Sequence, residues 1–192
     1  MNARRAGDRG WLLEADVPLD VAAAVRVSFG NRVEEVVPGH ATVLVVGDIS
    51  AGELLAVEAP PSSRATGRMV EIPVTYDGTD LAEVASLTGL GVDEVIAIHS
   101  GTTYTAAFLG FLPGFAYLVG LDERLLVPRR PQPRTSVAGG TVAIAGPYSG
   151  IYPRESPGGW RLLGTTDAAL FDETRQQPNL IAAADSVRFV PL

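Results

Sequence analysis

Glycine and proline interrupt this 192-residue chain so often that long uninterrupted helices are excluded from much of it. The chain contains 21 Gly and 14 Pro. They are densest after Ser100, where strand-like runs alternate with Pro-Gly, Gly-Gly, Tyr-Ser-Gly and Pro-Gly-Gly turns. These runs include Thr103–Phe111, Thr141–Ala145 and Val187–Val190. Short strands separated by turn residues at frequent intervals are typical of a β-barrel or sandwich, which we expect for this half of the chain.

The first half has a different pattern. Pro18–Phe29 begins with proline, contains alanine in its middle and is followed by Gly30, which predicts a helix. Ser50, with Glu53 three residues later, is a capping-box pattern that predicts a second helix. The expected elements alternate as β-α-β-β-α-β: Trp11–Ala15, Pro18–Phe29, Arg32–Val37, Ala41–Val46, Ser50–Glu58 and Arg68–Val74. This order predicts a ferredoxin-like α+β domain, with a hairpin turn at Pro38-Gly39-His40.

A turn cluster at Tyr76-Asp77-Gly78 predicts the domain boundary. We therefore expect a small α+β domain over residues 1–76 and a β-barrel domain over residues 77–192. Two short helices, Thr79–Thr88 and Val92–His99, are expected directly after the boundary because their apolar residues recur at near-helical spacing.

Composition excludes several kinds of chemistry. The chain has no Cys, which rules out disulfides and thiol nucleophiles, and it has only two His, which rules out a multi-histidine metal site. All 15 basic residues are Arg, so a P-loop or Schiff-base lysine is absent. The formal charge of −7 argues against nucleic acid as a partner. With neither a signal peptide nor a membrane span evident, we expect a cytoplasmic protein.

Arginine is concentrated in the turn-rich half. Six arginines and a single acidic residue, Glu155, fall between residues 124 and 161; the arginines are Arg124, Arg129, Arg130, Arg134, Arg154 and Arg161. A guanidinium group binds both oxygens of a carboxylate or phosphate, so the cluster fits a cleft for a small anion. It equally fits a solvated surface on which arginine stems cover apolar residues. The sequence leaves both interpretations open.

Two further features are candidates for function. His99 has the chemistry of a general acid or base, or it caps the carbonyls at the end of its helix. The loop around Ser156, with Gly158 and Gly159, could bring backbone N–H groups close to an anion. The nearby aromatic residues Phe108, Phe111, Phe115 and Tyr117 fit a hydrophobic core better than a ligand platform.

Three segments in fixed order resemble a known family. They are FLGFLPGFAYLVGL from Phe108, VPRRPQPRTSVAGGTVAIAG from Val127 and GIYPRESPGGWRLLG from Gly150. The resemblance is to the family of the B subunit of bacterial 5-oxoprolinase, which also contains allophanate hydrolase subunit 1 and KipI-type inhibitors of sporulation kinases. It covers about Tyr76 to Leu192 and is weaker before that, where mainly the element order agrees.

The resemblance implies a cyclophilin-like β-barrel and a heteromeric complex with an A subunit, together with a homologue of the C subunit. The implied reaction is ATP-dependent opening of 5-oxo-L-proline to L-glutamate, with Mg²⁺-ATP used by the complex and no metal held by this chain. The implied alternatives are an inhibitor that binds a sensor histidine kinase and an allophanate-type amide hydrolase. The implied catalytic residues are His99 and Arg134.

The resemblance also carries over a set of substrate-binding positions for a small anionic substrate: Phe115, Tyr117, Gly139, Gly140, Ser156, Gly158 and Gly159. The chain departs from the family in two places, and the milder is Val119-Gly120, where the family often has Gly-Gly after the tyrosine. The segment Ser136-Val137-Ala138-Gly139-Gly140 lacks the Pro and Ser of the family's Val-Pro-Ala-Gly-Ser, which removes a hydroxyl at Gly140.

Overall fold

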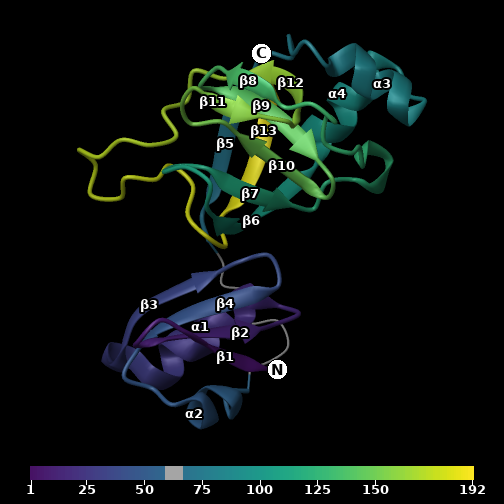
Figure 1. Ribbon diagram of the computed structural model, residues 1–192. Coiled ribbons are helices and arrows are strands. Elements are labelled where there is room, and N and C mark those ends of the chain that lie inside the picture. Colours follow the sequence, from purple (N-terminus) through teal and green to yellow (C-terminus); the bar gives the residue numbers. More distant parts are fainter. Residues whose placement is uncertain (59–66) are drawn as a thin grey trace. The chain divides into compact units, whose positions relative to one another are not determined.

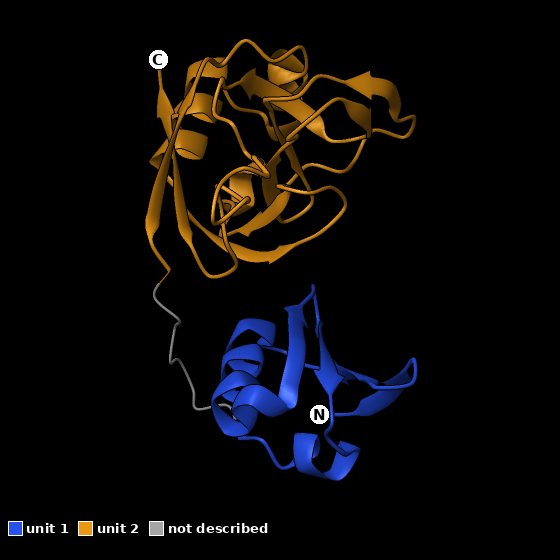
Figure 2. Cartoon of the chain, turned by 90° about the vertical axis from the view of Figure 1, so that its left-hand side faces the viewer, with its two compact units in different colours: residues 1–66 blue, residues 67–192 orange. Residues whose placement is uncertain are grey.

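The structure is a computed structural model that describes residues 1–58 and 67–192. The chain divides into two compact units, Met1–Thr66 and Gly67–Leu192 (Figure 2). The predicted boundary near Tyr76 lies later in the sequence than this division, and part of the predicted first domain, residues 59–66, lies outside the described residues.

The first unit contains a four-stranded antiparallel sheet packed against a helix (Figure 1). Its strand order is β1-β2-β4-β3. The elements are β1 (Ala3–Ala6), β2 (Gly10–Glu14), α1 (Pro18–Phe29), the 3₁₀ turn η1 (Gly30–Arg32), β3 (Val33–Pro38), β4 (Thr42–Gly47) and α2 (Ala51–Leu55). Helix α1 buries Val21, Ala22 and Val25, which lie on one helical face, against β3 and β4.

Two local predictions in this unit are confirmed. Helix α1 has the predicted bounds, with proline in its first turn and Gly30 as its C-cap. At the start of α2, the Ser50 Oγ accepts a hydrogen bond from the Glu53 backbone N–H at 3.3 Å, and Glu53 Oε2 accepts from the Ser50 N–H at 2.9 Å. This is the reciprocal capping box, which satisfies two N–H groups that a helix start leaves unpaired.

The ferredoxin-like prediction is not confirmed, because the strand expected last joins the other unit. That strand, β5 (Met69–Val74), pairs in parallel with β13 (Ser186–Pro191) near the other end of the chain. The fourth strand of the first sheet is instead β1, an unpredicted strand that contains Arg4 and Arg5 and pairs with β2.

The second unit is a nearly closed β-barrel, as predicted. Its seven-stranded sheet has the order β12-β9-β10-β7-β6-β13-β5. The two edge strands approach one another where Thr75, just after β5, exchanges two backbone hydrogen bonds with Thr165 at 2.9 and 2.8 Å. The remaining strands are β6 (Thr103–Leu109), β7 (Ala116–Val119), β8 (Arg134–Val137), β9 (Thr141–Ala145), β10 (Tyr148–Ile151), β11 (Ser156–Gly158) and β12 (Arg161–Thr165).

Three short helical segments accompany the barrel: α3 (Leu81–Thr88), α4 (Val92–Gly101) and the 3₁₀ turn η2 (Glu123–Leu125). Strand β9 is buried on both faces and separates two apolar clusters. Val142 and Ile144 belong to the large core cluster, whereas Ala143 and Ala145 belong to a second cluster that contains aromatic residues. Because consecutive strand residues point to opposite faces, the small alanines leave room for those rings.

Candidate functional site

A two-stranded ribbon of β8 and β11 brings several predicted site residues together. Ser156 lies opposite Val137, and Gly158 lies opposite Arg134, with an irregularity in register between the two pairs. The backbone N–H of Arg130, in the segment before β8, donates to the Gly159 carbonyl at 2.8 Å. The ribbon therefore brings Arg134, Ser156, Gly158 and Gly159 into neighbouring segments of the fold.

Arg134 is held by a buried carboxylate that the sequence analysis did not select. Its Nη2 donates to Asp80 Oδ1 at 2.6 Å, and the Leu162 backbone N–H donates to Asp80 Oδ2 at 2.8 Å. Asp80 is only 2% exposed. Burial by itself would raise the pKa of Asp80, but the hydrogen bonds from Arg134 and Leu162 outweigh it, so that the pKa lies below its usual value. Asp80 is thus a charged anchor that fixes the Arg134 guanidinium.

Three other arginines of the cluster, Arg124, Arg130 and Arg161, are also paired. Arg130 Nη1 lies 3.1 Å from Asp80 and 3.2 Å from Glu83, and Arg161 Nη1 lies 2.6 Å from Glu83. Arg124 pairs with Asp122 at 2.7 Å. The acidic residues at the start of α3 therefore neutralise much of the positive charge that the arginines between residues 124 and 161 carry.

Buried donors remain without partners at this site. Within the part of the chain that the structure describes, Arg134 Nη1, Arg130 Nε and Ser156 Oγ are buried atoms that lack a hydrogen-bond partner. Leaving such a group unpaired costs about 1–3 kcal/mol, so native proteins rarely tolerate it without a reason. Arg134 and Ser156 can both donate, and an anion is the acceptor that would satisfy both.

An aromatic cluster lies beside the ribbon. Phe115, 1% exposed, meets the rings of Tyr152 and Trp160 edge-on at 5.7 and 5.4 Å. Tyr117 stacks on Phe108 at 4.3 Å. Val137, opposite Ser156 on the ribbon, belongs to the same cluster. The core interpretation therefore holds for Phe115, and Ser156 and Gly158 border this cluster through Val137 and Tyr152.

The glycines have a structural explanation within the chain. A Cβ on Gly158 would collide with the Tyr152 ring, and one on Gly140, whose φ is +80°, would collide with the Thr166 carbonyl oxygen. A Cβ on Gly139 would lie 3.0 Å from Arg154 Cα. Other atoms of the protein fill the space beside these three glycines, so the phosphates of ATP do not fit there. Only Gly159 has ordinary contacts, at 3.5 Å and beyond.

His99 lies apart from this cluster. It is fully buried near the end of α4, where Nδ1 is 2.7 Å from the Tyr76 hydroxyl and Nε2 is 2.9 Å from Ser149 Oγ. Its ring stacks on Phe189 at 4.5 Å. Burial lowers the pKa of His99 to about 3, which keeps the ring neutral. No hydrogen bond or ring contact among the described residues joins His99 to Arg134 or Ser156.

Sequence reasoning missed Asp80, Glu83, Tyr152 and Ser149. Asp80 and Glu83 lie 54 and 47 residues before the arginines that they pair with, Arg134 and Arg130 respectively. The only local signal was their position at the start of a predicted helix, where acidic residues are common for a different reason. Tyr152 and Ser149 fall in or beside the third family-like segment, but their residue types gave no separate indication of burial.

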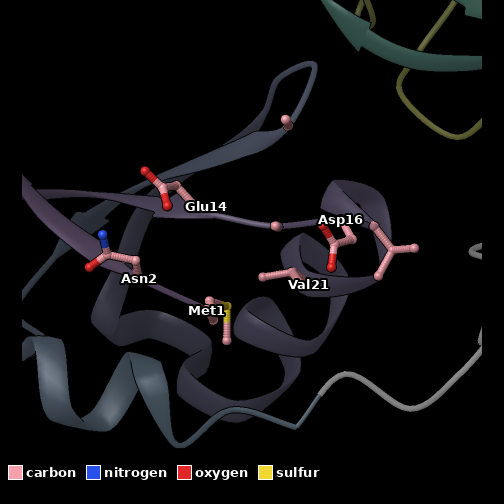
Figure 3. A pocket seen from close by; sticks show the side chains of 8 residues that line it. Met1, Asn2, Glu14, Asp16 and Val21 are labelled. Carbon is pink, nitrogen blue, oxygen red and sulfur yellow. The ribbon is translucent and has the colours of Figure 1, made fainter.

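The first unit contains a separate pocket of about 650 Å³ (Figure 3). Residues at the chain start, the end of β2 and the start of α1 line it, among them Met1, Glu14, Asp16 and Val21. None of the predicted site residues lines this pocket. No group of three or more His, Cys, Asp or Glu able to hold a metal occurs among residues 1–58 and 67–192. None of the described helices combines the length and apolar character that a membrane crossing requires.

Comparisons with known proteins agree with the family-like segments. A family model described as the carboxyltransferase domain, subdomain C and D, matches residues 1–181. The chain is 39% identical over 205 residues to the 5-oxoprolinase B subunit of Escherichia coli O157:H7, covering 96% of this chain and 93% of that protein. It is 32% identical over 124 residues to urea amidolyase of Lachancea kluyveri, covering 58% of this chain and 6% of that protein.

A solved structure is similar along its whole length. A conserved uncharacterized protein from Pyrococcus horikoshii is 38% identical and superimposes with a TM-score of 0.63, covering 100% of this chain and 97% of that one. Similarity in sequence and in structure thus extends over both units, including the first, where the family-like segments are absent.

Proposed function

Because the chain belongs to the carboxyltransferase subdomain C and D family and, within it, to the group of 5-oxoprolinase B subunits, we propose that it is part of an ATP-dependent complex that opens 5-oxo-L-proline to L-glutamate. The observation that carries this proposal is the pair of buried, unpartnered donors, Arg134 Nη1 and Ser156 Oγ, on one ribbon. The substrate is a carboxylate, and a carboxylate accepts hydrogen bonds from both groups.

In this proposal, Arg134 binds the substrate carboxylate. Asp80 already occupies one edge of the guanidinium through Nη2, which fixes the orientation of the planar group and leaves Nη1 for the ligand. The Arg134 side chain as a whole is 24% exposed, although its Nη1 is a buried atom. A guanidinium held in advance loses less entropy on binding than a free surface arginine.

The chemistry requires hydrolysis of a lactam amide. The C–N bond of the ring breaks, the oxygen of water becomes part of the new carboxylate, and the ring nitrogen takes up protons to become the amino group of glutamate. The backbone N–H of Gly159 is the donor that we assign to the charge developing on the amide oxygen, since Arg134 and Ser156 bind the carboxylate. Because the glycines of this chain do not fit a phosphate cradle, we assign ATP and Mg²⁺ to the complex and derive no step through them here.

In this proposal, His99 has a structural role in positioning parts of the barrel, in place of the catalytic role that the family resemblance implies. Its neutral ring bridges Tyr76, just after β5, and Ser149 on β10, and so it ties two strands of the barrel together. A proton carrier that exchanges with substrate needs hydrogen-bond reach to it, directly or through a water. The buried position of His99, between two hydroxyl partners, favours the structural assignment.

The complex is expected to need further chains. The names of the relatives describe subunits, and we propose an A-type subunit, together with a homologue of the C subunit, as the partners that complete the site. The isolated chain is accordingly expected to show little or no turnover of 5-oxoproline.

The test is a reconstitution of the chain with its A-type and C-type partners, followed by assay of 5-oxoproline-dependent ATP hydrolysis. A charged hydrogen bond is worth about 1.5–3 kcal/mol, so Arg134→Ala should raise the KM for 5-oxoproline by about 10- to 100-fold. Ser156→Ala should also raise this KM, because it removes the second donor to the carboxylate. Arg124→Ala is the matched control, because Arg124 lies in the same arginine-rich region but pairs with Asp122. Full activity in both Arg134→Ala and Ser156→Ala would overturn the site assignment.

The similarity to urea amidolyase supports a second candidate, an allophanate-type amide hydrolase. Allophanate also carries a carboxylate beside an amide, so the same ribbon would bind it. Assays of both substrates with the reconstituted complex distinguish the candidates: selective turnover of allophanate would replace the first proposal with the second.

A further inference from the structure

Phe111 has a backbone conformation that a bulky residue rarely adopts. Its φ is +68°, and the Leu112 N–H donates to the Gly110 carbonyl oxygen at 2.8 Å, which closes a three-residue turn around Phe111. With a positive φ at its centre, this is the rarer and more strained form of the γ-turn. For a side chain as large as Phe, such a conformation costs on the order of 1–3 kcal/mol.

The surrounding loop enforces this conformation. The Gly110 N–H donates to the Phe115 carbonyl at 3.2 Å, and the Phe115 N–H donates to the Leu112 carbonyl at 3.0 Å. Gly114, with φ of +86°, packs so closely that a Cβ there would lie 2.8 Å from the Phe171 Cβ. The turn is therefore held from both sides by the packing of the segment between β6 and β7.

The strain does not serve burial. Phe111 is 57% exposed, which differs from the core position expected from the sequence, whereas Phe115 four residues later is 1% exposed. The Phe111 ring meets Phe115 at 5.4 Å and Tyr152 at 6.3 Å, both nearly perpendicular. A costly turn that exposes a large apolar ring is a feature that folding alone does not explain.

Tyr152 connects this ring to the ribbon. Gly158, opposite Arg134, packs directly against the Tyr152 ring. Moving from Phe111 through the buried Tyr152 to the ribbon, the side chains thus change from an exposed apolar ring to paired arginines and buried, unpartnered donors. A ligand with a compact apolar ring and one carboxylate matches that change in character.

We propose that Phe111 is a specificity-determining residue that packs against the ring of a small cyclic carboxylate while the Arg134 and Ser156 donors bind its carboxylate group. The inference rests on the proposed function for the identity of the ligand. It adds a side chain that selects the ring, so that open-chain carboxylates of similar charge bind less tightly.

The test measures binding to the reconstituted complex by isothermal titration calorimetry. The probes are 5-oxo-L-proline, cyclopentanecarboxylate, which has the ring and carboxylate but no amide, and acetate, which has no ring. The key variant is Phe111→Gly, because glycine adopts a positive φ without strain. The variant removes the apolar area that would cover the ligand's saturated ring, so it should weaken both ring ligands by about tenfold.

The same variant should leave acetate binding unchanged and should not lower the thermal midpoint, since it removes strain and an exposed ring. Ala184→Gly is the matched control: Ala184, with φ of +72°, is the other non-glycine residue with positive φ in the described chain, and its substitution should leave all three ligands unaffected. Phe111→Tyr should restore most of the affinity for ring ligands.

Two results would overturn the inference: unchanged binding of both ring ligands to Phe111→Gly, or an equal loss for acetate, which would mean that the loop acts through Arg134. Weakened assembly with the partner chains and normal ligand binding would identify Phe111 as an interface residue instead. If the wild-type complex binds cyclopentanecarboxylate but not 5-oxoproline, and Phe111→Gly weakens that binding, the proposed substrate fails while the ring-selecting role stands.

Discussion

At the scale of single residues, burial decides what His99 can do. It is one of the two histidines of the chain, and the sequence predicts that it lies near the end of a helix. Both a proton-transfer role and a capping role fit that position. The structure places it between two hydroxyl groups and against Phe189, in surroundings that disfavour a charged ring. Sequence reasoning selects residue types, but it could not show that this imidazole is enclosed by residues from β10 and β13, far along the chain.

We expect His99 to make stability depend on pH. Its folded pKa of about 3 lies below the ordinary 6.5, so between these values the unfolded chain binds a proton that the native chain does not. Its contribution is fully present above pH 6.5. As the pH falls below that value, the free energy of unfolding should drop by up to about 1.4 kcal/mol per pH unit.

Urea denaturation between pH 4 and pH 8 measures this slope. His99→Gln, which retains hydrogen-bonding groups but does not titrate, should flatten it, and substitution of the exposed His40 by Gln should not. An unchanged slope in His99→Gln would show that other groups govern the acid sensitivity. Should that variant not fold, wild type and His40→Gln still test the sign of the slope.

At the scale of elements, β5 shows where local pattern stops being informative. The sequence predicted a strand over Arg68–Val74, and in the structure β5 alternates exposed and buried residues. An alternating pattern does not identify the partner strand. The partner is β13, and the paired residues Glu71 and Arg188 are 117 residues apart in the sequence. Helices α1 and α2 were predicted because Pro18, Gly30 and the Ser50–Glu53 box act within a few residues. Strand β1 was missed because its apolar content is two alanines around two arginines.

Closure of the barrel gives a prediction at this scale. Gly164 lies where β12 meets Thr75, and a Cβ there would collide with the Thr75 carbonyl oxygen, which forms one of the two closing hydrogen bonds. Gly164→Ala should therefore destabilise the protein by about 1–3 kcal/mol, the usual range for overpacking. Thermal or urea unfolding followed by circular dichroism measures the loss.

Gly101→Ala is the control within the same unit. Gly101 ends α4, and a Cβ there would meet nothing within 4 Å. Alanine has the better helix propensity, so this change should leave stability unchanged or raise it by at most about 1 kcal/mol. Equal stability of the two variants would show that Thr75 and Thr165 do not close the barrel as described. If Gly164→Ala lacked a cooperative unfolding transition and Gly101→Ala retained one, the result would support closure of the barrel at Thr75 and Thr165.

At the scale of the whole molecule, the boundary between the units determines which fragments can fold. The second unit has its own core and includes β5, so a fragment of residues 67–192 should unfold cooperatively. A fragment of residues 77–192, cut at the predicted boundary, lacks β5 and Thr75. It should lose cooperativity or aggregate, because β13 is then left as an exposed edge.

Circular dichroism melts and size-exclusion chromatography of the two fragments check this expectation, with the full chain as the reference. If the shorter fragment melted like the longer one, β5 would be dispensable and the parallel β5–β13 pairing would carry little of the barrel's stability.

The late position of β13 also has a consequence during synthesis. As the ribosome releases the nascent chain from its exit tunnel, the first unit already has every strand of its sheet, whereas β5 and β6 emerge long before the strand that joins them. The half-made barrel therefore presents open strand edges until β13 has emerged from the tunnel. We expect chaperones to bind this intermediate rather than the first unit, because its unpaired strand edges are the part of the nascent chain most prone to aggregation.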